Sequence, residues 1–270
     1  MEGYIDKDHI ELINKFSVED PSTREPVPQV RYHIFFHGRI YNLISLSITF
    51  VDDQRQDIRK TIFEVFEKYD FNFKKLNDAL NGDYALVIVK EINEKIKEVW
   101  MSTDHIANIK LWWFTKGSKI QFSLKEFEGA YLMPAGFMSN IRLNEEGEIK
   151  EEIFMEYEEK GVFGPRVTDL SSAYVLVGFA LDCIIEKRLK YTNKIFVGES
   201  VYDKYIMKVA KMYAKQDIQE CSEGGPDVIR GVFNEAVEEG IYPFLDKTFM
   251  RLMSRVDEPD ELLCRLFSGL

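Results

Sequence analysis

Short runs rich in β-branched and aromatic residues fill the first half of the chain, and they constrain its fold more than any other feature. Gly, Asn or Asp bound several of these runs, as expected for strands that turns connect. Between them, the apolar positions of 57–69 have the spacing of a helix with one buried face, and 73–80 has the pattern of a shorter helix. The runs expected to form strands are 31–36, 40–50, 85–90, 97–103, 110–115 and 120–123.

The second half of the chain has a different pattern. Residues 148–160 are densely acidic, which indicates a linker or an exposed helix, and 175–189 is strongly apolar, which predicts a buried helix. A β-rich front and a helical back predict an α+β chain of two domains, 1–150 and 160–270. Further predicted elements are helices at 4–16, 200–214, 227–239, 247–256 and 261–267 and a short strand at 194–198.

Charge and cysteine content restrict the class of partner and the compartment. The formal net charge of the 270 residues is -11, which disfavours general attraction to nucleic-acid phosphates or anionic lipid surfaces. The three cysteines, Cys183, Cys221 and Cys264, form no disulfide framework and no zinc-binding spacing with the four histidines. No apolar run approaches the roughly 20 residues that span a bilayer. We therefore expect a cytoplasmic or otherwise intracellular protein with no nucleic-acid partner and no membrane insertion.

The segment 36–42 reads Phe-His-Gly-Arg-Ile-Tyr-Asn. It resembles the Phe-Asn-Gly-Glu-Ile-Tyr-Asn segment of class II glutamine amidotransferases, the N-terminal half of asparagine synthetase. In that family the Asn and Gly build the oxyanion hole, and the Glu helps to bind the amino group of the substrate. The resemblance implies a vestigial glutamine pocket at His37, Gly38 and Arg39. Arg39 reverses the charge at the position where the cationic ammonium would lie.

Other segments carry the same resemblance, in order, over residues 17–149. They include the helix 57–69 and the runs 80–88, 102–110 and 132–136, which are similar to a strand, a loop and a turn of that family. The resemblance implies that 1–150 is a class II glutamine amidotransferase-like domain. Its expected fold is that of the N-terminal-nucleophile hydrolases, with layered antiparallel sheets and helices.

The back half has a thinner resemblance to the asparagine synthase domain. Residues 242–247 resemble its Val-Pro-Phe-Leu-Asp-Lys turn, and 198–204 resemble its Gly-Glu-Gly-Ser-Asp-Glu loop. The resemblance implies that 160–270 is a truncated asparagine synthase-like domain, a small and mainly helical α/β remnant. The residues it marks as a vestigial nucleotide loop are Asp169, Ser171, Ser172, Glu199 and Asp203.

The chemistry of the family requires residues that this sequence replaces. Its nucleophile is an N-terminal cysteine, whereas this chain begins Met1-Glu2-Gly3 and has its first cysteine at Cys183. Its pyrophosphate loop needs glycines whose backbone N–H groups reach phosphate, and 164–169 contains Pro165, which has no N–H to donate. We therefore expect a pseudoenzyme with no catalytic residues, no cofactor and no metal. On this view His37 is a polar residue at a strand end and Arg39 a surface or salt-bridge residue.

Three functions remain open from the sequence. The first is a catalytically degenerate asparagine synthetase-like protein that acts as a structural or binding subunit of a larger assembly, as a homo- or hetero-oligomer with protein partners. The second is an active ATP-dependent amide-forming synthetase with reduced domains. The third is an amino-acid-binding sensor, in which Arg39 would favour an anionic ligand.

Overall fold

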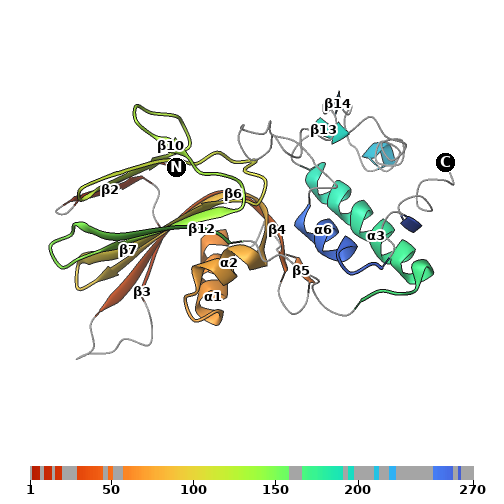
Figure 1. The fold of residues 1–270 in the computed structure, drawn as a ribbon, viewed down its shortest axis with the longest axis horizontal. Helices are drawn as coiled ribbons and strands as arrows, with labels where there is room; N and C mark the ends of the chain where they lie inside the picture. The colour runs from red at the N-terminus through yellow and green to blue at the C-terminus, as the bar shows by residue number, and fades with distance from the viewer. Residues whose placement is uncertain are drawn as a thin grey trace. The chain divides into compact units, whose positions relative to one another are not determined.

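The structure is a computed structural model, and it describes residues 2–6, 9–13, 16–19, 29–44, 48–50, 57–157, 166–190, 194–197, 210–212, 219–222, 246–257 and 261–262. The chain divides into two compact units, Met1–Glu158 and Glu159–Leu270 (Figure 1). In the segments described, no helix is both long and apolar enough to cross a membrane.

The first unit contains two antiparallel sheets. The larger sheet has the strand order β12-β11-β7-β6-β4-β3, and β5 also pairs with β4; the smaller has the order β10-β8-β9-β1-β2. The strands of the larger sheet are β3 (Phe16–Glu19), β4 (Val30–Ile44), β5 (Ile48–Phe50), β6 (Leu80–Ile92), β7 (Lys95–Thr103), β11 (Phe137–Leu143) and β12 (Ile149–Glu156). Those of the smaller sheet are β1 (Glu2–Asp6), β2 (His9–Ile13), β8 (Trp112–Lys116), β9 (Lys119–Ser123) and β10 (Tyr131–Leu132).

The alternation of side chains along β4 and β6 gives the larger sheet two buried faces. Phe35 and Val87 pack against the smaller sheet in one core cluster. Ile34 and Ile88 belong to a second cluster, against the helices α1 (Ile58–Lys68) and α2 (Phe73–Ala79). The unit is therefore layered as sheet, sheet and helices, with cores on both sides of the larger sheet.

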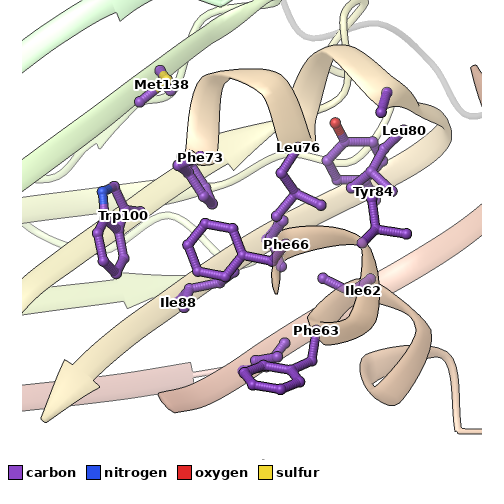
Figure 2. Packing of buried hydrophobic residues seen from close by; sticks show 14 of the residues in the cluster. Ile62, Phe63, Phe66, Phe73, Leu76, Leu80, Tyr84, Ile88, Trp100 and Met138 are labelled. Carbon is purple, nitrogen blue, oxygen red and sulfur yellow. The ribbon is translucent and has the colours of Figure 1, made fainter. Parts of the chain in front are cut away.

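Aromatic side chains dominate the core beneath the helices (Figure 2). Phe66 of α1 is fully buried, and its ring lies edge-on to Trp100, with centroids 5.7 Å apart, and to Phe73, at 6.3 Å. Edge-to-face pairs of this kind add to the free energy of apolar burial. The helices begin at capping side chains, because Asp57 accepts from the N–H of Arg59 and Asn72 from that of Lys75.

Two sequence predictions in this unit are wrong. The segment predicted as a helix at 4–16 forms the hairpin of β1 and β2, in which Ile5 pairs with Ile10. Its apolar positions lie on two paired strands rather than along one helix. The acidic stretch predicted as a linker or helix at 148–160 contains strand β12, at the end of the larger sheet. Charged residues suit an edge strand, and Glu151 pairs there with Arg142, Oε2 to Nη1 at 2.9 Å.

The second unit is described mainly through two helices, α3 (Leu170–Arg188) and α6 (Lys247–Met253), and the parallel pair β13 (Lys194–Val197) and β14 (Gln219–Ser222). The predicted helix at 175–189 is confirmed in type but begins earlier, at Leu170. The expectation that it is buried is wrong for its first half, because Val175 is 66% and Phe179 67% exposed. The predicted helix at 227–239 and most of that at 200–214 lie outside the described residues.

A buried ion pair joins α3 to α6. An Arg188 Nη2–H donates to Asp246 Oδ2 at 2.8 Å, and both side chains are 2% exposed. Asp246 also caps α6 by accepting from the N–H of Thr248. The fold class predicted from the sequence, α+β with layered antiparallel sheets and helices, is confirmed.

Candidate functional site

The three residues of the predicted glutamine pocket lie on β4, directly opposite β6. In the register of the two strands His37 pairs with Ala85, Gly38 with Tyr84 and Arg39 with Asp83. The side chain of His37 is exposed and that of Arg39 is half-buried. The structure therefore brings the three predicted residues together with an acidic residue, Asp83, on the neighbouring strand.

Two glycines allow the backbones of β4 and β6 to approach closely at this point. Gly38 has φ +116°, and a Cβ there would lie 2.0 Å from the carbonyl oxygen of Asp83. A Cβ on Gly82 would lie 2.0 Å from the carbonyl oxygen of Arg39. Only glycine fits either position, because the obstacle is backbone that no rotamer change moves. The register then shifts between Ile40 and Asn42, which turns the end of β4.

Asp83 interacts with two other polar residues of the first unit, Tyr41 and Asp104. Its Oδ2 accepts from the Tyr41 hydroxyl at 2.5 Å. Its charge also acts on Asp104, which is fully buried and follows the end of β7. Two carboxyl groups therefore lie near the close approach of Gly38 and Gly82: that of Asp83 is half-buried and that of Asp104 is fully buried.

Asp104 is the most perturbed titratable group of the site. Burial raises the pKa of Asp104 to about 7 and the charge of Asp83 adds to the rise, while backbone N–H donors, those of Asn108, Ile109 and Ile106, lower it. Its two oxygens accept four backbone N–H bonds at 3.1–3.2 Å, from Tyr84 and from those three residues. These bonds fix the loop after β7 against β6.

A buried hydrogen-bond network supports the same strands. Asn77 of α2 accepts at Oδ1 from the hydroxyls of Ser102, at 2.5 Å, and Tyr84, at 3.2 Å, and its Nδ2–H donates to the carbonyl of Phe73 at 2.8 Å. Such a network specifies one arrangement, because each buried polar atom left unpaired has a cost of about 1–3 kcal/mol. The network holds α2, β6 and β7 in register below the site.

Sequence reasoning assigned no role to Asp83, Asp104 or Asn77. Asp83 and Asp104 lie inside the segments 80–88 and 102–110 that carry the family resemblance. The sequence therefore marked both segments, but nothing in it singled out the two aspartates. Within the part of the chain that the structure describes, no three His, Cys, Asp or Glu side chains are grouped to hold a metal ion.

The predicted nucleotide-loop residues that the structure describes cap a helix. Asp169 accepts from the backbone N–H groups of Ser171, at 3.2 Å, and Ser172, at 2.9 Å, and from the Ser172 hydroxyl at 2.5 Å. These bonds lower the pKa of Asp169, the Ser172 hydroxyl most of all. The three residues therefore begin α3. Glu199 and Asp203 lie outside the described residues.

No protein-family model and no curated protein matches the chain. Among solved structures, the chain is similar to glutamine phosphoribosylpyrophosphate amidotransferase from B. subtilis complexed with ADP and GMP, with 11% identity and a TM-score of 0.35 over 78% of this chain and 48% of that one. It is also similar to a structure described as the allosteric regulatory enzyme of purine biosynthesis, with 13% identity and a TM-score of 0.34 over 74% of this chain and 45% of that one. The chain thus spans about half the length of these proteins. At such identities the likeness concerns the fold and not the activity.

Proposed function

We propose that the protein is a catalytically degenerate relative of asparagine synthetase that serves as a structural or binding subunit of a larger assembly. The resemblance of 36–42 to the amidotransferase loop supports the ancestry. The close approach of β4 and β6 at Gly38 supports the view that the backbone of this segment is still that of the family. Arg39 supports the loss of glutamine binding, because its cation would repel the ammonium of the substrate.

An apolar surface on α3 is the observation that carries the proposal. Four large side chains in the first half of this helix are 45–67% exposed: Tyr174, Val175, Leu176 and Phe179. By helical periodicity the last three lie on one side of α3, and they are here called the α3 apolar face. The opposite side of the same helix is apolar and buried, through Val177, Leu181 and Ile185. One face already fills the interior, and the second packs against nothing among the residues that the structure describes. Clustered exposed apolar side chains of this kind mark contact surfaces.

The composition of the face indicates the chemistry of a partner. Phe179 offers a large rigid ring of the kind that anchors protein interfaces. At helical spacing, Val175 and Phe179 are followed on the same side by Asp182 and Glu186. A protein surface with an apolar patch next to basic side chains fits this stripe. The net charge of -11 argues against a nucleic acid as the partner.

The native mass of the protein in extracts of its own cells tests the proposal. We expect the wild-type chain to elute in a complex well above its own 31.6 kDa, and Phe179→Glu to release it as a free chain. The matched control is Lys60→Glu, on the exposed side of α1. A wild-type chain that elutes alone, or a complex that survives Phe179→Glu, contradicts the proposal.

Thermal unfolding with ligands separates this function from the synthetase and the sensor. Mg-ATP, AMP, glutamine, glutamate and aspartate are each added at millimolar concentration. A ligand at 100 times its Kd stabilises the fold by about 2.7 kcal/mol, which is a readily visible shift. The proposal predicts no shift with any of the five. A shift with Mg-ATP would favour the synthetase, and one with an amino acid would favour the sensor.

A further inference from the structure

Three polar side chains from three neighbouring strands form a chain of hydrogen bonds away from the glutamine-pocket residues. The Ser17 hydroxyl of β3 lies 2.9 Å from His33 Nδ1 on β4. His33 Nε2 lies 2.8 Å from Glu91 Oε2 on β6. Strand register produces the arrangement, because Ser17 is paired directly with His33, and Glu91 is paired with Arg31, two residues before His33.

The three side chains differ in exposure in a way that suits a reactive group. His33 is 2% exposed and Glu91 8%, whereas Ser17 is exposed and lies on β3, the last strand in the order of its sheet. The hydroxyl therefore reaches solvent while the imidazole behind it is held in a protected environment.

The hydrogen bonds determine which nitrogen of His33 acts as a base. The other oxygen of Glu91 accepts from Arg31 Nη1–H at 3.2 Å, so the carboxylate bridges the guanidinium and the imidazole. A carboxylate can only accept, so Nε2 of His33 carries the hydrogen that it donates to Glu91. The neutral imidazole then presents the lone pair of Nδ1 to the hydroxyl of Ser17.

We propose that Ser17, His33 and Glu91 form a nucleophile, a general base and its orienting carboxylate, and that this site transfers acyl groups from activated esters to water. A nucleophile bonded to a base that a third group orients is the arrangement by which Ser is activated. The inference does not rest on the proposed binding function, since it uses none of the residues of the glutamine pocket or of α3.

The reaction proceeds in two balanced steps. Ser17 Oγ attacks the acyl carbon as its proton passes to His33 Nδ1, and the alcohol leaves with that proton, so that an acyl ester remains on Ser17. Water then gives a proton to Nδ1 and attacks the ester, and the proton returns to Ser17 Oγ as the carboxylic acid is released. Glu91 stabilises the imidazolium in both steps without itself taking the proton.

Covalent labelling of the full chain with diisopropyl fluorophosphate tests the site, with release of p-nitrophenol from p-nitrophenyl acetate as a second readout. In the labelling, Oγ displaces fluoride and its proton passes to Nδ1. We expect one label per chain, located at Ser17 by peptide mapping. His33→Gln should slow it about 10²-fold or more, the range of general-base contributions. The matched control is Ser254→Ala, whose exposed hydroxyl donates only to the carbonyl of Arg251 among the bonds described.

Ser17→Ala keeps the test valid if His33→Gln fails to fold, because Ser17 is exposed and its loss leaves the buried pair intact. This variant should lose both the label and the ester hydrolysis and keep the thermal stability of the parent. Absence of label from Ser17 in the folded wild-type chain overturns the proposal. Labelling of a folded His33→Gln at the wild-type rate, or ester hydrolysis unchanged in Ser17→Ala, overturns it as well.

Discussion

Helices α1 and α3 use apolar side chains in opposite ways. In α1 the apolar residues Ile62, Phe63, Val65 and Phe66 are all buried, and the exposed positions hold Lys60, Glu64, Glu67 and Lys68. In α3 apolar residues lie on both sides of the helix. Among the described residues, α1 therefore keeps its exposed side polar, whereas α3 leaves large apolar side chains exposed.

The interiors behind the two helices also differ. Phe66 of α1 packs against aromatic rings, and the packing needs no charge. Arg188 at the end of α3 is buried against Asp246. A buried ion pair adds little net stability but makes the loss of either partner costly. The comparison therefore predicts different responses to substitution in the two units.

The largest expected effect comes from truncating the buried face of α1. Phe66→Ala leaves a cavity among the rings of Trp100 and Phe73 and should lower the free energy of unfolding by about 3–5 kcal/mol. Phe179→Ala on the exposed face of α3 should change it by less than about 0.5 kcal/mol. Urea unfolding followed by circular dichroism measures both variants, and equal effects would abolish the distinction between the helices.

The next effect tests the charged interior of the second unit. Asp246→Asn keeps an oxygen for the cap of α6 but removes the carboxylate charge that pairs with the buried Arg188, and it should cost about 3 kcal/mol. Adding Arg188→Met should recover much of this loss, because the buried charge is then gone. A double variant no more stable than Asp246→Asn would show that the ion pair is not the reason for the loss.

The third effect, the smallest per step of the measurement, is a pH dependence of the first unit. The folded pKa of Asp104, about 7, lies above its usual value of 3.8. Between about pH 4 and pH 7 the folded chain holds a proton that the unfolded chain has released, so stability falls as pH rises through this window and levels off above it. The slope is at most about 1.4 kcal/mol per pH unit.

Tryptophan fluorescence isolates this dependence, because Trp100, Trp112 and Trp113, the three tryptophans of the chain, all lie in the first unit. Asp104→Asn should flatten the profile, whatever its effect on absolute stability. A wild-type profile that rises from pH 5 to pH 7, or one that Asp104→Asn leaves unchanged, would show that the four N–H bonds keep the carboxylate ionised.

The sequence predicts elements better than it predicts their pairing. The β-branched runs at 85–90 and 97–103 became β6 and β7, because their composition suits buried strands. The hairpin at 2–13 was missed, because the five apolar positions of 4–16 fit a helix as well as two strands. Charge alone gave the wrong element at 148–160, since an edge strand tolerates the same acidic residues as a linker.

Much the same limit applies to the sites. The segment 36–42 identified His37, Gly38 and Arg39, but not the backbone contact between Gly38 and Asp83, because that contact depends on the register of β4 and β6. Ser17 and His33 are 16 residues apart along the chain, and His33 and Glu91 are 58 apart, so only strand pairing brings the three together. No short sequence motif contains all three of these residues.

Photocrosslinking in the protein's own cells tests most directly the claim that α3, and not α1, presents a contact surface. p-Benzoylphenylalanine is placed at Phe179 of α3 or, in a matched variant, at Glu67 on the exposed side of α1. Irradiation should join the chain to a defined protein partner from position 179 and yield no adduct from position 67. Adducts from neither position, or equal adducts from both, would contradict the assignment of the α3 apolar face as a binding surface.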